Sequence, residues 1–348
     1  MESSTLQTVI PAGRLSAVQK ALLRAFNTAD VSDISPVAGG LSAAPVFKIT
    51  VNKEAYILKL GSTQGIVNPV AEPYVNMEIA ANAGIAPPLY YLNAVDALSI
   101  TKFIEHKSLR AVFTSPDVLL EKLAKTIRSI HEMPQLPKEN SLWSIVESLI
   151  QQVRETPMGT NTVFEDFFEY YEIIRLYYPW DDKDTVSSHN DLNPGNILCD
   201  GKRIWIVDWD AAHRNDRYVD LAISANSFVR SESQEKLFLE AYFGDELNSY
   251  KSARFFVMRQ ICRLIYAALM FKFAHTSDPT CNLDDPDLQT VNMQKIGEQI
   301  GSGKLSISSS KGQLFYGKAM INEALIDMRS SRFVFSIDLL AHVPDRDF

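Results

Sequence analysis

Residues 188–210 of this chain read SHNDLNPGNILCDGKRIWIVDWD, and this stretch decides the fold that the sequence predicts. The runs NILCD and RIWIV are β-prone, and the Asp-Gly pair between them is a turn signal. We therefore expect the two runs to pair as a hairpin that folds about residue 201 or 202. Such a hairpin brings Asn196 and Asp208 side by side at its open end, with Asp191 just upstream.

The polar residues at the open end of this hairpin suit a magnesium ion. Mg²⁺ prefers one or two protein oxygens, completed by waters and phosphate oxygens, to a full cage of protein ligands. Asn196 and Asp208 supply two such oxygens, and the Asp191 carboxylate follows the same loop. The stretch therefore predicts that three polar groups converge on a bound polyphosphate.

The rest of the chain predicts an α+β protein with two lobes. The runs ISPVAGG, PVFKITV and AYILKL indicate three short strands, a helix should follow from Pro73 to Gly84, and PPLYYLN and ALSITKFIE indicate two more strands. Apolar residues then recur at helical spacing over residues 115–133, 142–153, 163–177, 235–243 and 253–273. We expect a β-rich N-terminal lobe with one helix, residues 1–103, and a larger helical lobe, residues 104–348.

Composition and charge narrow the class of protein. The chain has 348 residues, is 46% hydrophobic and carries a net charge of −8, which disfavours a nucleic-acid partner. Its start, MESSTLQTVIPAG, lacks a basic segment with an apolar run, and the run LIYAALMF is far too short to cross a membrane. We therefore expect a cytoplasmic protein with no membrane insertion. Cys199, Cys262 and Cys281 are widely spaced and predict reduced thiols without a metal.

The polar pattern of the hairpin resembles the catalytic loop of the protein-kinase-like superfamily. HNDLNPGN is similar to H-R-D-x-x-x-x-N, and Asp208 in VDWD resembles the metal-binding aspartate of D-F-G. Only eleven residues separate Asp208 from Asp220, too few for a peptide-docking activation segment. The string DWDAAHRNDRYVDLA instead resembles the aminoglycoside phosphotransferase and choline kinase family, and most of all bacterial choline/ethanolamine kinase-like proteins.

This resemblance implies a bilobed protein-kinase-like fold that binds ATP and Mg²⁺. Asp191 would receive or orient the acceptor's hydroxyl proton, Asn196 and Asp208 would hold magnesium, and Lys59 in YILKL would pair with the α- and β-phosphates. Asp210 could either join the metal site or cap the following turn. His189 is expected to brace the loop.

The resemblance also implies where the phosphates of the nucleotide lie. AGGLSAAPVF is similar to the G-G-[LM]-[ST]-N loop of choline kinases, with Ala43 in place of the asparagine. Two adjacent glycines by themselves are more often a tight turn. Their position one hairpin ahead of Lys59 favours the phosphate role for Gly39, Gly40 and Ser42.

Two further nucleotide contacts follow from the same family. The segment ITKFIEHKSLR looks like the hinge of choline kinases, so backbone groups of Lys102 and Ile104 would bind adenine. A glutamate should pair with Lys59, and either Glu72 or Glu78 could serve, with Glu72 nearer the expected register.

The predicted function is ATP- and Mg²⁺-dependent transfer of the γ-phosphate to a hydroxyl of a small acceptor. Because the chain is acidic, we expect a cationic acceptor of the choline or ethanolamine kind. The alternatives are an aminoglycoside phosphotransferase, a kinase of another metabolite such as thiamine, a sugar or homoserine, and a nucleotide-binding pseudokinase without turnover. The oligomeric state stays open.

Overall fold

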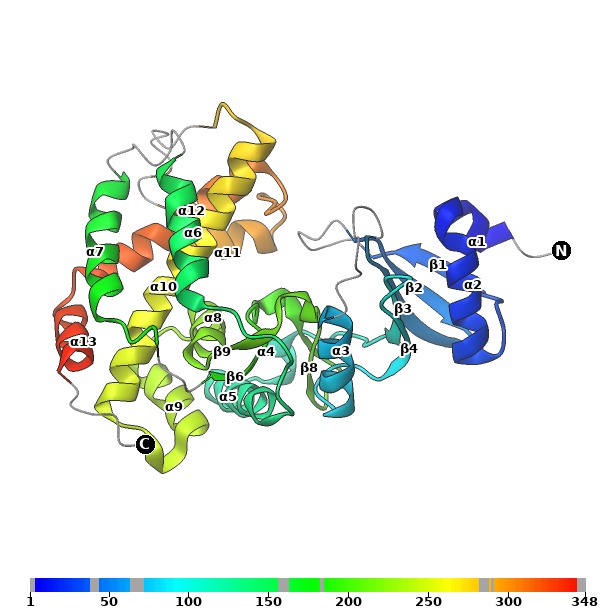
Figure 1. Cartoon of the computed structure of the whole chain (residues 1–348), viewed down its shortest axis with the longest axis horizontal. Coiled ribbons are helices and arrows are strands. Elements are labelled where there is room, and N and C mark those ends of the chain that lie inside the picture. Colours follow the sequence, from blue (N-terminus) through cyan, green and yellow to red (C-terminus); the bar gives the residue numbers. More distant parts are fainter. Residues whose placement is uncertain are drawn as a thin grey trace. The chain divides into compact units, whose positions relative to one another are not determined.

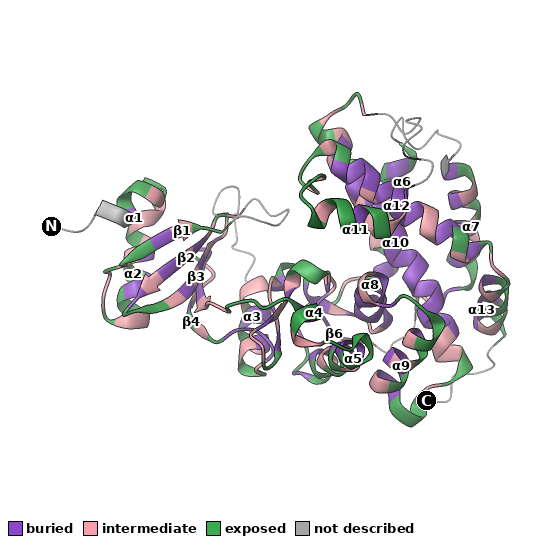
Figure 2. Cartoon of the chain, turned by 180° about the vertical axis from the view of Figure 1, so that it is seen from behind, coloured by how far each residue is buried: buried purple, intermediate pink, exposed green. Residues whose placement is uncertain are grey.

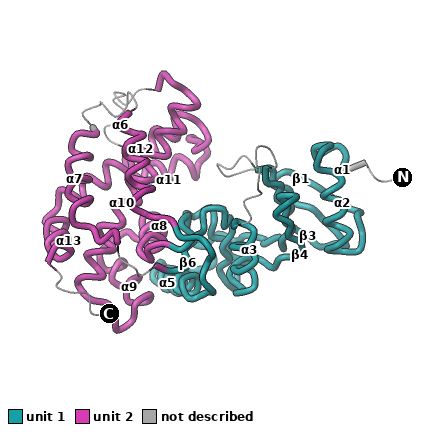
Figure 3. The backbone as a smooth tube through the Cα atoms, viewed as in Figure 1, with its two compact units in different colours: residues 1–139, 186–214 teal, residues 140–185, 215–348 magenta. Residues whose placement is uncertain are grey.

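The computed structural model describes residues 4–37, 44–62, 72–155, 163–181, 185–281, 288 and 291–342. The chain divides into two compact units (Figure 3). Unit 1 comprises residues 1–139 and 186–214, and unit 2 comprises residues 140–185 and 215–348. Unit 1 thus holds the predicted hairpin together with the N-terminal strands. The functional division into lobes at residue 103 stays a prediction.

Unit 1 contains a five-stranded antiparallel sheet in the order β1-β2-β3-β5-β4 (Figure 1). Its strands are β1 (Asp33–Pro36), β2 (Val46–Val51), β3 (Glu54–Leu60), β4 (Leu89–Asn93) and β5 (Leu98–Lys102). All five match strands predicted from the sequence. Asn52 and Lys53 join β2 to β3 in a two-residue turn in which both have positive φ, as such hairpin turns require.

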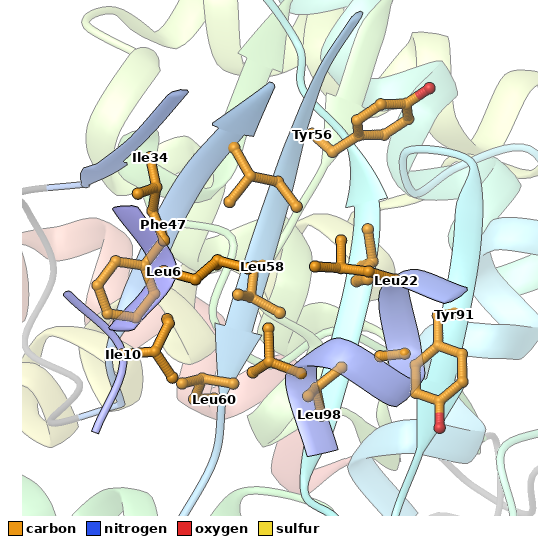
Figure 4. Packing of buried hydrophobic residues seen from close by; sticks show 14 of the residues in the cluster. Leu6, Ile10, Leu22, Ile34, Phe47, Tyr56, Leu58, Leu60, Tyr91 and Leu98 are labelled. Atoms are coloured by element: carbon orange, nitrogen blue, oxygen red, sulfur yellow. The ribbon is translucent and has the colours of Figure 1, made fainter. Parts of the chain in front are cut away.

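One face of this sheet is covered by two N-terminal helices, α1 (Ser4–Val9) and α2 (Ala12–Phe26). Alternate residues of β2 and β3 are buried, and they pack with apolar side chains of the helices (Figure 4). The buried cluster includes Leu6, Ile10, Val18, Leu22, Phe47, Ile49, Leu58 and Leu60. The prediction of a single helix before residue 103 was therefore wrong, although Leu15, Val18 and Leu22 of α2 already stand at helical spacing.

The third helix of unit 1, α3 (Glu72–Asn82), was predicted and ends as expected. Gly84 has φ +71°, and the Ile85 N–H donates to the Ala80 carbonyl, which together close the last turn. The buried Asn76 side chain donates to the Ala212 carbonyl over 2.7 Å. This bond ties α3 to the loop that follows Asp208.

The remainder of unit 1 combines helices with short strands. It contains α4 (Leu109–Val112) and α5 (Pro116–Glu132), which has Pro116 in its first turn and buries Leu119, Leu123 and Ile127. Strands β7 (Ile197–Cys199) and β8 (Ile204–Ile206) form the hairpin. Strands β6 (Thr185–Ser188) and β9 (His213–Asp216) lie where the chain passes between the units.

Unit 2 is built from helices, as predicted for most of its length. These are α6 (Leu142–Arg154), α7 (Val163–Tyr177), α8 (Tyr218–Phe228), α9 (Glu232–Phe243), α10 (Ser249–Ser277), α11 (Met293–Gly301), α12 (Ser310–Met328) and α13 (Ser331–Ala341). The 29-residue α10 is buried along most of its length (Figure 2). None of the helices that the structure describes is both long and apolar enough to span a membrane.

Three arginines lie on α10 although this helix is buried. Charges removed from water must be paired, and each arginine meets a carboxylate from another element of unit 2. The pairs are Arg254 with Asp216 at 2.7 Å, Arg259 with Glu235 at 2.8 Å, and Arg263 with Asp327 at 2.6 Å. These ion pairs fix the positions of the helices around α10.

Replacing Leu22 by alanine tests whether α2 is part of the core. Leu22 is 0% exposed and Leu23, its neighbour in α2, is 51% exposed. Leu22→Ala should lower the free energy of unfolding by about 3 kcal/mol because it leaves a cavity, and Leu23→Ala should change it by less than about 0.5 kcal/mol. Urea unfolding followed by circular dichroism measures both. Equal losses for the two variants would contradict this packing.

Candidate active site

The hairpin forms in the register that the sequence predicts. Ile197 pairs with Ile206 and Cys199 with Ile204, so the chain folds back between residues 201 and 202. The Val207 N–H donates to the Asn196 carbonyl over 3.0 Å, which extends the pairing by one step. Asn196 and Asp208 therefore lie together at the open end of the hairpin.

Both oxygens of the Asp191 carboxylate accept hydrogen bonds from side-chain amides. Asn193 Nδ2 donates to Oδ1 and Asn196 Nδ2 donates to Oδ2, each over 2.9 Å. The Asn193 amide is itself oriented, because its Oδ1 accepts from the Gly195 N–H at 2.8 Å. Asp191 is thus held in one orientation from two sides.

Asn193 was not among the residues that the sequence indicated for the site. Its local signal was an asparagine directly before Pro194 and Gly195, a typical turn position. Asn193 precedes the short 3₁₀ helix η2 (Pro194–Asn196) and caps its first turn. The turn and the Asp191 contact therefore use the two ends of one side-chain amide.

His189 contacts the backbone of the Asp191 loop, which is the structural role predicted for it. Its ring is fully buried and lies edge-on to Trp209, with the ring centres 4.8 Å apart. Nε2 is 3.0 Å from the Val207 carbonyl, and Nδ1 accepts from the Asp191 N–H at 3.3 Å. Because Nδ1 accepts a hydrogen bond and Nε2 faces a carbonyl oxygen, the ring must carry its proton on Nε2. His189 thereby links the Asp191 loop to the end of the hairpin.

Two residues of the site adopt the left-handed backbone conformation. Asp208 has φ 65° and ψ 69°, and Asn190 has φ 63°. This region is unusual for residues other than glycine, although asparagine and aspartate tolerate it best. Asn190 Nδ2 lies within 3.2 Å of three carbonyls, those of Ser188, Ala211 and His213. These contacts hold the Asn190 backbone and the turn after Asp208 together.

Lys59 contacts two carboxylates of the same loop. Its Nζ atom lies 2.8 Å from Asp208 Oδ1 and 2.8 Å from Asp210 Oδ2. On β3 the side chains of Tyr56, Leu58 and Leu60 are buried in the core, so that Lys59 extends from the opposite face of the sheet. Asp210 lies in the 3₁₀ helix η3 (Trp209–Ala211), directly after the left-handed turn at Asp208.

The pKa of Lys59 reflects a balance of burial and charge. Burial alone would lower it, but the carboxylates of Asp210 and Asp208 outweigh burial and raise the pKa above its usual value. Lys59 is therefore a fixed positive charge at neutral pH. Its two acidic partners in turn lie close to one cation.

The described ion pairs of Lys59 involve aspartates, whereas the sequence predicts a glutamate partner. Neither Glu72 nor Glu78 is among the ion-pair partners of Lys59 in the part of the chain that the structure describes. Both lie on α3, where Asn76 holds the helix against the loop after Asp208. A pairing of Lys59 with either glutamate stays a prediction.

The predicted nucleotide contacts fall partly inside the described chain. Gly39, Gly40 and Ser42 lie outside the described residues. The Lys102 N–H donates to the Pro88 carbonyl over 2.9 Å, so that only its carbonyl could bind adenine. No backbone partner of the Ile104 N–H lies among the residues with described positions.

Comparison with known proteins gives a consistent result. The sequence model of a phosphotransferase enzyme family matches residues 33–256, well over half of the chain. A choline/ethanolamine kinase family protein from Mesorhizobium loti is similar in structure, with a TM-score of 0.70 and 16% identity over 95% of this chain and 100% of that chain. A spectinomycin phosphotransferase in complex with ADP and spectinomycin has a TM-score of 0.50 and 14% identity over 87% of this chain and 98% of that one.

These likenesses confirm the predicted fold, that of the kinase family to which the Mesorhizobium protein belongs. Relatives found by sequence similarity match this chain over a smaller part of its length. A LicA homolog of Metamycoplasma hominis is 29% identical over 131 residues, which are 37% of this chain and 50% of that protein. The chain spans between 28% and 52% of the length of three mycoplasma relatives that it matches.

Removing one carboxylate should lower the pKa of Lys59. Asp210→Asn leaves the burial of Lys59 unchanged but deletes one of the two charges that favour its protonated form. The pKa of Lys59 should therefore fall relative to the wild type, as measured by ¹³C NMR of the lysine side chains. Glu54→Gln removes a carboxylate from the same strand that pairs with Lys102, and should leave Lys59 unchanged. The same pKa in wild type and Asp210→Asn would contradict the observed ion pair.

Proposed function

Because the chain belongs to the phosphotransferase enzyme family, we propose that it is an ATP- and magnesium-dependent kinase of a small-molecule hydroxyl group. The observation that carries this proposal is the fixed Asp191 carboxylate next to Asn196, on the loop before a hairpin that ends at Asp208, and Asp208 in turn contacts Lys59 of β3. Phosphoryl transfer depends mostly on positioning and on neutralisation of charge. A pre-oriented carboxylate beside a cation and two acids provides both.

Magnesium would be held by Asn196, Asp208 and Asp210. Asn196 directs its amide nitrogen at Asp191, which leaves its amide oxygen as the ligand atom. The carboxylates of Asp208 and Asp210 already converge on one cation, the Lys59 ammonium, so that their geometry fits a cation at this place. The donor set therefore suits Mg²⁺, which takes its remaining ligands from water and phosphate.

Lys59 would act on the nucleotide, and Asp191 would act on the acceptor. Lys59 would pair with the α- and β-phosphates, exchanging part of its contact with Asp208 and Asp210 for phosphate oxygens. Asp191 would accept a hydrogen bond from the acceptor hydroxyl and orient it toward the γ-phosphate. Magnesium, when bound, neutralises the negative charge of the phosphates. The amides of Asn193 and Asn196 keep the Asp191 carboxylate from rotating during this contact.

The adenine would be bound by backbone groups of the segment after β5. The Lys102 carbonyl and the Ile104 N–H are one acceptor and one donor, which match the edge of an adenine ring. Gly39, Gly40 and Ser42 would cover the phosphates with backbone N–H groups. The ADP complex of the structurally similar spectinomycin phosphotransferase supports a nucleotide for this family.

The acceptor would be a small alcohol with a positive charge. The net charge of −8 favours a cation, and the similar Mesorhizobium protein is of the choline/ethanolamine kinase family. An aminoglycoside is the rival acceptor, supported by the likeness to the spectinomycin phosphotransferase. A pseudokinase is disfavoured because Lys59, Asp191, Asn196 and Asp208 are all present.

Two substitutions should separate the roles of the site carboxylates. Asp191→Asn should lower kcat at least about 10²-fold and leave Mg-ATP affinity nearly unchanged, because only the acceptor hydroxyl loses its carboxylate. Asp208→Asn should instead remove the magnesium dependence of ATP binding, because the ion loses a charged ligand. Calorimetry with and without magnesium, together with an ATP-consumption assay, measures these effects.

The control for these variants is Asp117→Asn on the exposed surface of α5, which should behave as wild type. Full turnover by Asp191→Asn would rule out its assigned role. If the wild-type protein binds Mg-ATP but phosphorylates none of the acceptors below, that result would favour the pseudokinase alternative.

The acceptor class can be tested by comparing charged and uncharged alcohols. The value of kcat/KM should be at least about tenfold higher for choline, ethanolamine, thiamine or an aminoglycoside than for sugars, methylthioribose or homoserine. The preference should weaken at high salt, because salt screens the attraction between an acidic protein and a cation. Turnover of an uncharged sugar alone, without salt dependence, would contradict the cationic acceptor while leaving the kinase proposal intact.

A further inference from the structure

A pocket of about 180 Å³ lies in unit 1 at the closed end of the β7–β8 hairpin. Lys122 of α5 lines one side, and Lys202 and Arg203 from the hairpin turn line the other. Ile85, Phe113 and Ile204 supply apolar lining. The pocket is separate from the candidate active site. Asp208 follows Arg203 by five positions in the sequence, a length of about 16 Å in an extended strand.

Three cationic residues line this pocket. None of Lys122, Lys202 and Arg203 pairs with a carboxylate within the described ranges of the chain. Glu121 directly precedes Lys122 on α5, but its carboxylate pairs with Lys125, whose Nζ atom is 3.8 Å from Glu121 Oε2. Unpaired cations gathered around a hollow are unexpected in a chain with a net charge of −8.

Arg203 is pre-oriented for a ligand. Its guanidinium stacks on the Trp205 ring at 4.0 Å and also donates to the Gly84 carbonyl. The Trp205 indole in turn donates to Asp200 Oδ2 over 2.9 Å. Because the ring and the carbonyl fix the guanidinium plane, less conformational entropy is lost when its remaining N–H groups bind an anion.

The acid of the hairpin turn, Asp200, is already occupied by local donors. Its Oδ1 accepts from the Lys202 and Arg203 N–H groups at 2.8 and 2.9 Å, and its Oδ2 accepts from Trp205. The Trp205 bond and these turn N–H groups lower the pKa of Asp200 to about 2. Asp200 therefore shapes the turn, and its oxygens are directed at these donors instead of at the cationic side chains.

The other polar groups of the pocket are not donors to a ligand. Thr126 donates its hydroxyl proton to the Lys122 carbonyl over 2.8 Å, and Ser129 donates to the Lys125 carbonyl over 3.0 Å. The charged residues that line the pocket are thus Lys122, Lys202 and Arg203. Such a set recognises an anion with several oxygens and more than one negative charge.

We propose that this pocket binds a phosphate dianion, either inorganic phosphate or the phosphate group of a small phosphomonoester. The three cations match the charge and the several acceptor oxygens of such a group. Since one water takes about 30 Å³ in the liquid, the pocket has room for a phosphate and a few carbon atoms. Ile85, Phe113 and Ile204 would contact those carbons. The ligand would lie at one end of the hairpin whose other end carries Asn196 and Asp208.

Indole NMR signals can locate phosphate on this protein. The chain has four tryptophans, and Trp205→Phe identifies the Trp205 signal. Trp205 stacks against Arg203, which lines the pocket. Trp209 directly follows Asp208 in the candidate active site. Titration with inorganic phosphate at constant ionic strength should shift the Trp205 signal saturably.

Two matched variants test the cations of the pocket. The double variant Lys122→Gln/Lys202→Gln should raise the apparent Kd for phosphate about fivefold to tenfold, because two charged contacts are lost. Lys125→Gln removes the same charge from α5 outside the pocket and should change Kd by less than about twofold. An unshifted Trp205 signal, a double variant that binds like wild type, or an equal loss in Lys125→Gln would each overturn the proposal.

The same spectra separate this proposal from the proposed kinase function. A shift of Trp209 alone would mean that phosphate binds only near Asp208, which overturns the pocket proposal and not the kinase. A saturable Trp205 shift that depends on Lys122 and Lys202 would support the pocket even if no acceptor were phosphorylated.

The source of the phosphate group is tested with glycerol phosphate and with phosphatidylcholine vesicles that contain phosphatidic acid. Binding of glycerol phosphate that the double variant loses would assign a soluble metabolite. Binding of the vesicles alone, again lost in the double variant, would assign a lipid headgroup. Either outcome supports a phosphomonoester site, and binding of inorganic phosphate alone would assign the free dianion. Binding of none of the three would contradict the proposal.

Discussion

The ammonium of Lys59 between the carboxylates of Asp208 and Asp210 is the interaction around which unit 1 is arranged. Lys59 is on the third strand of the sheet, and the two acids follow the hairpin 149 and 151 residues later in the chain. The strand presents Lys59 on one face because its other face is buried against α1 and α2. The acids meet Lys59 because the backbone turns sharply at Asp208.

The left-handed conformation of Asp208 is maintained by its surroundings. A non-glycine residue in this region costs of order 1 kcal/mol, and such a cost persists only where neighbouring contacts fix the backbone. Asn76 of α3 bonds the Ala212 carbonyl, and Asn190 bonds the Ala211 and His213 carbonyls. His189 holds the Val207 carbonyl just before the turn. Four side-chain contacts therefore position the short segment that carries both acids.

The hairpin serves a different electrostatic purpose at each end. Its open end brings acids together with the Asp191 loop, which suits magnesium and a transferred phosphoryl group. Its closed end gathers Lys202 and Arg203 opposite Lys122 of α5, which suits a phosphate dianion. One backbone bond joins the segment after β5 to the last residue of β7, since the Lys107 N–H donates to the Cys199 carbonyl over 2.7 Å. One short hairpin, with three residues in each strand, thus carries residues of both proposed sites.

The sequence by itself determined those parts of the protein that depend on local preferences. The hairpin register follows from two β-prone runs around an Asp-Gly turn, and the end of α3 follows from Gly84, which adopts a positive φ at low cost. The strands and most helices follow from apolar spacing. Asp191, Asn196 and Asp208 could be placed together because they flank one short hairpin. Apolar residues in α1 and α2 also stand at helical spacing. The position of these helices on the sheet, however, depends on which sheet face is buried.

The tertiary structure alone decided the contacts between residues far apart in the chain. Lys59 contacts Asp208 and Asp210 because the sheet face, the hairpin and α3 must first be packed together. The role of Asn193 depends on which way its amide points, and this is set by the turn it caps. The basic pocket likewise exists only because α5 packs beside β8. Sequence spacing specifies neighbours within a few residues, whereas burial of the core against solvent specifies which distant charges meet.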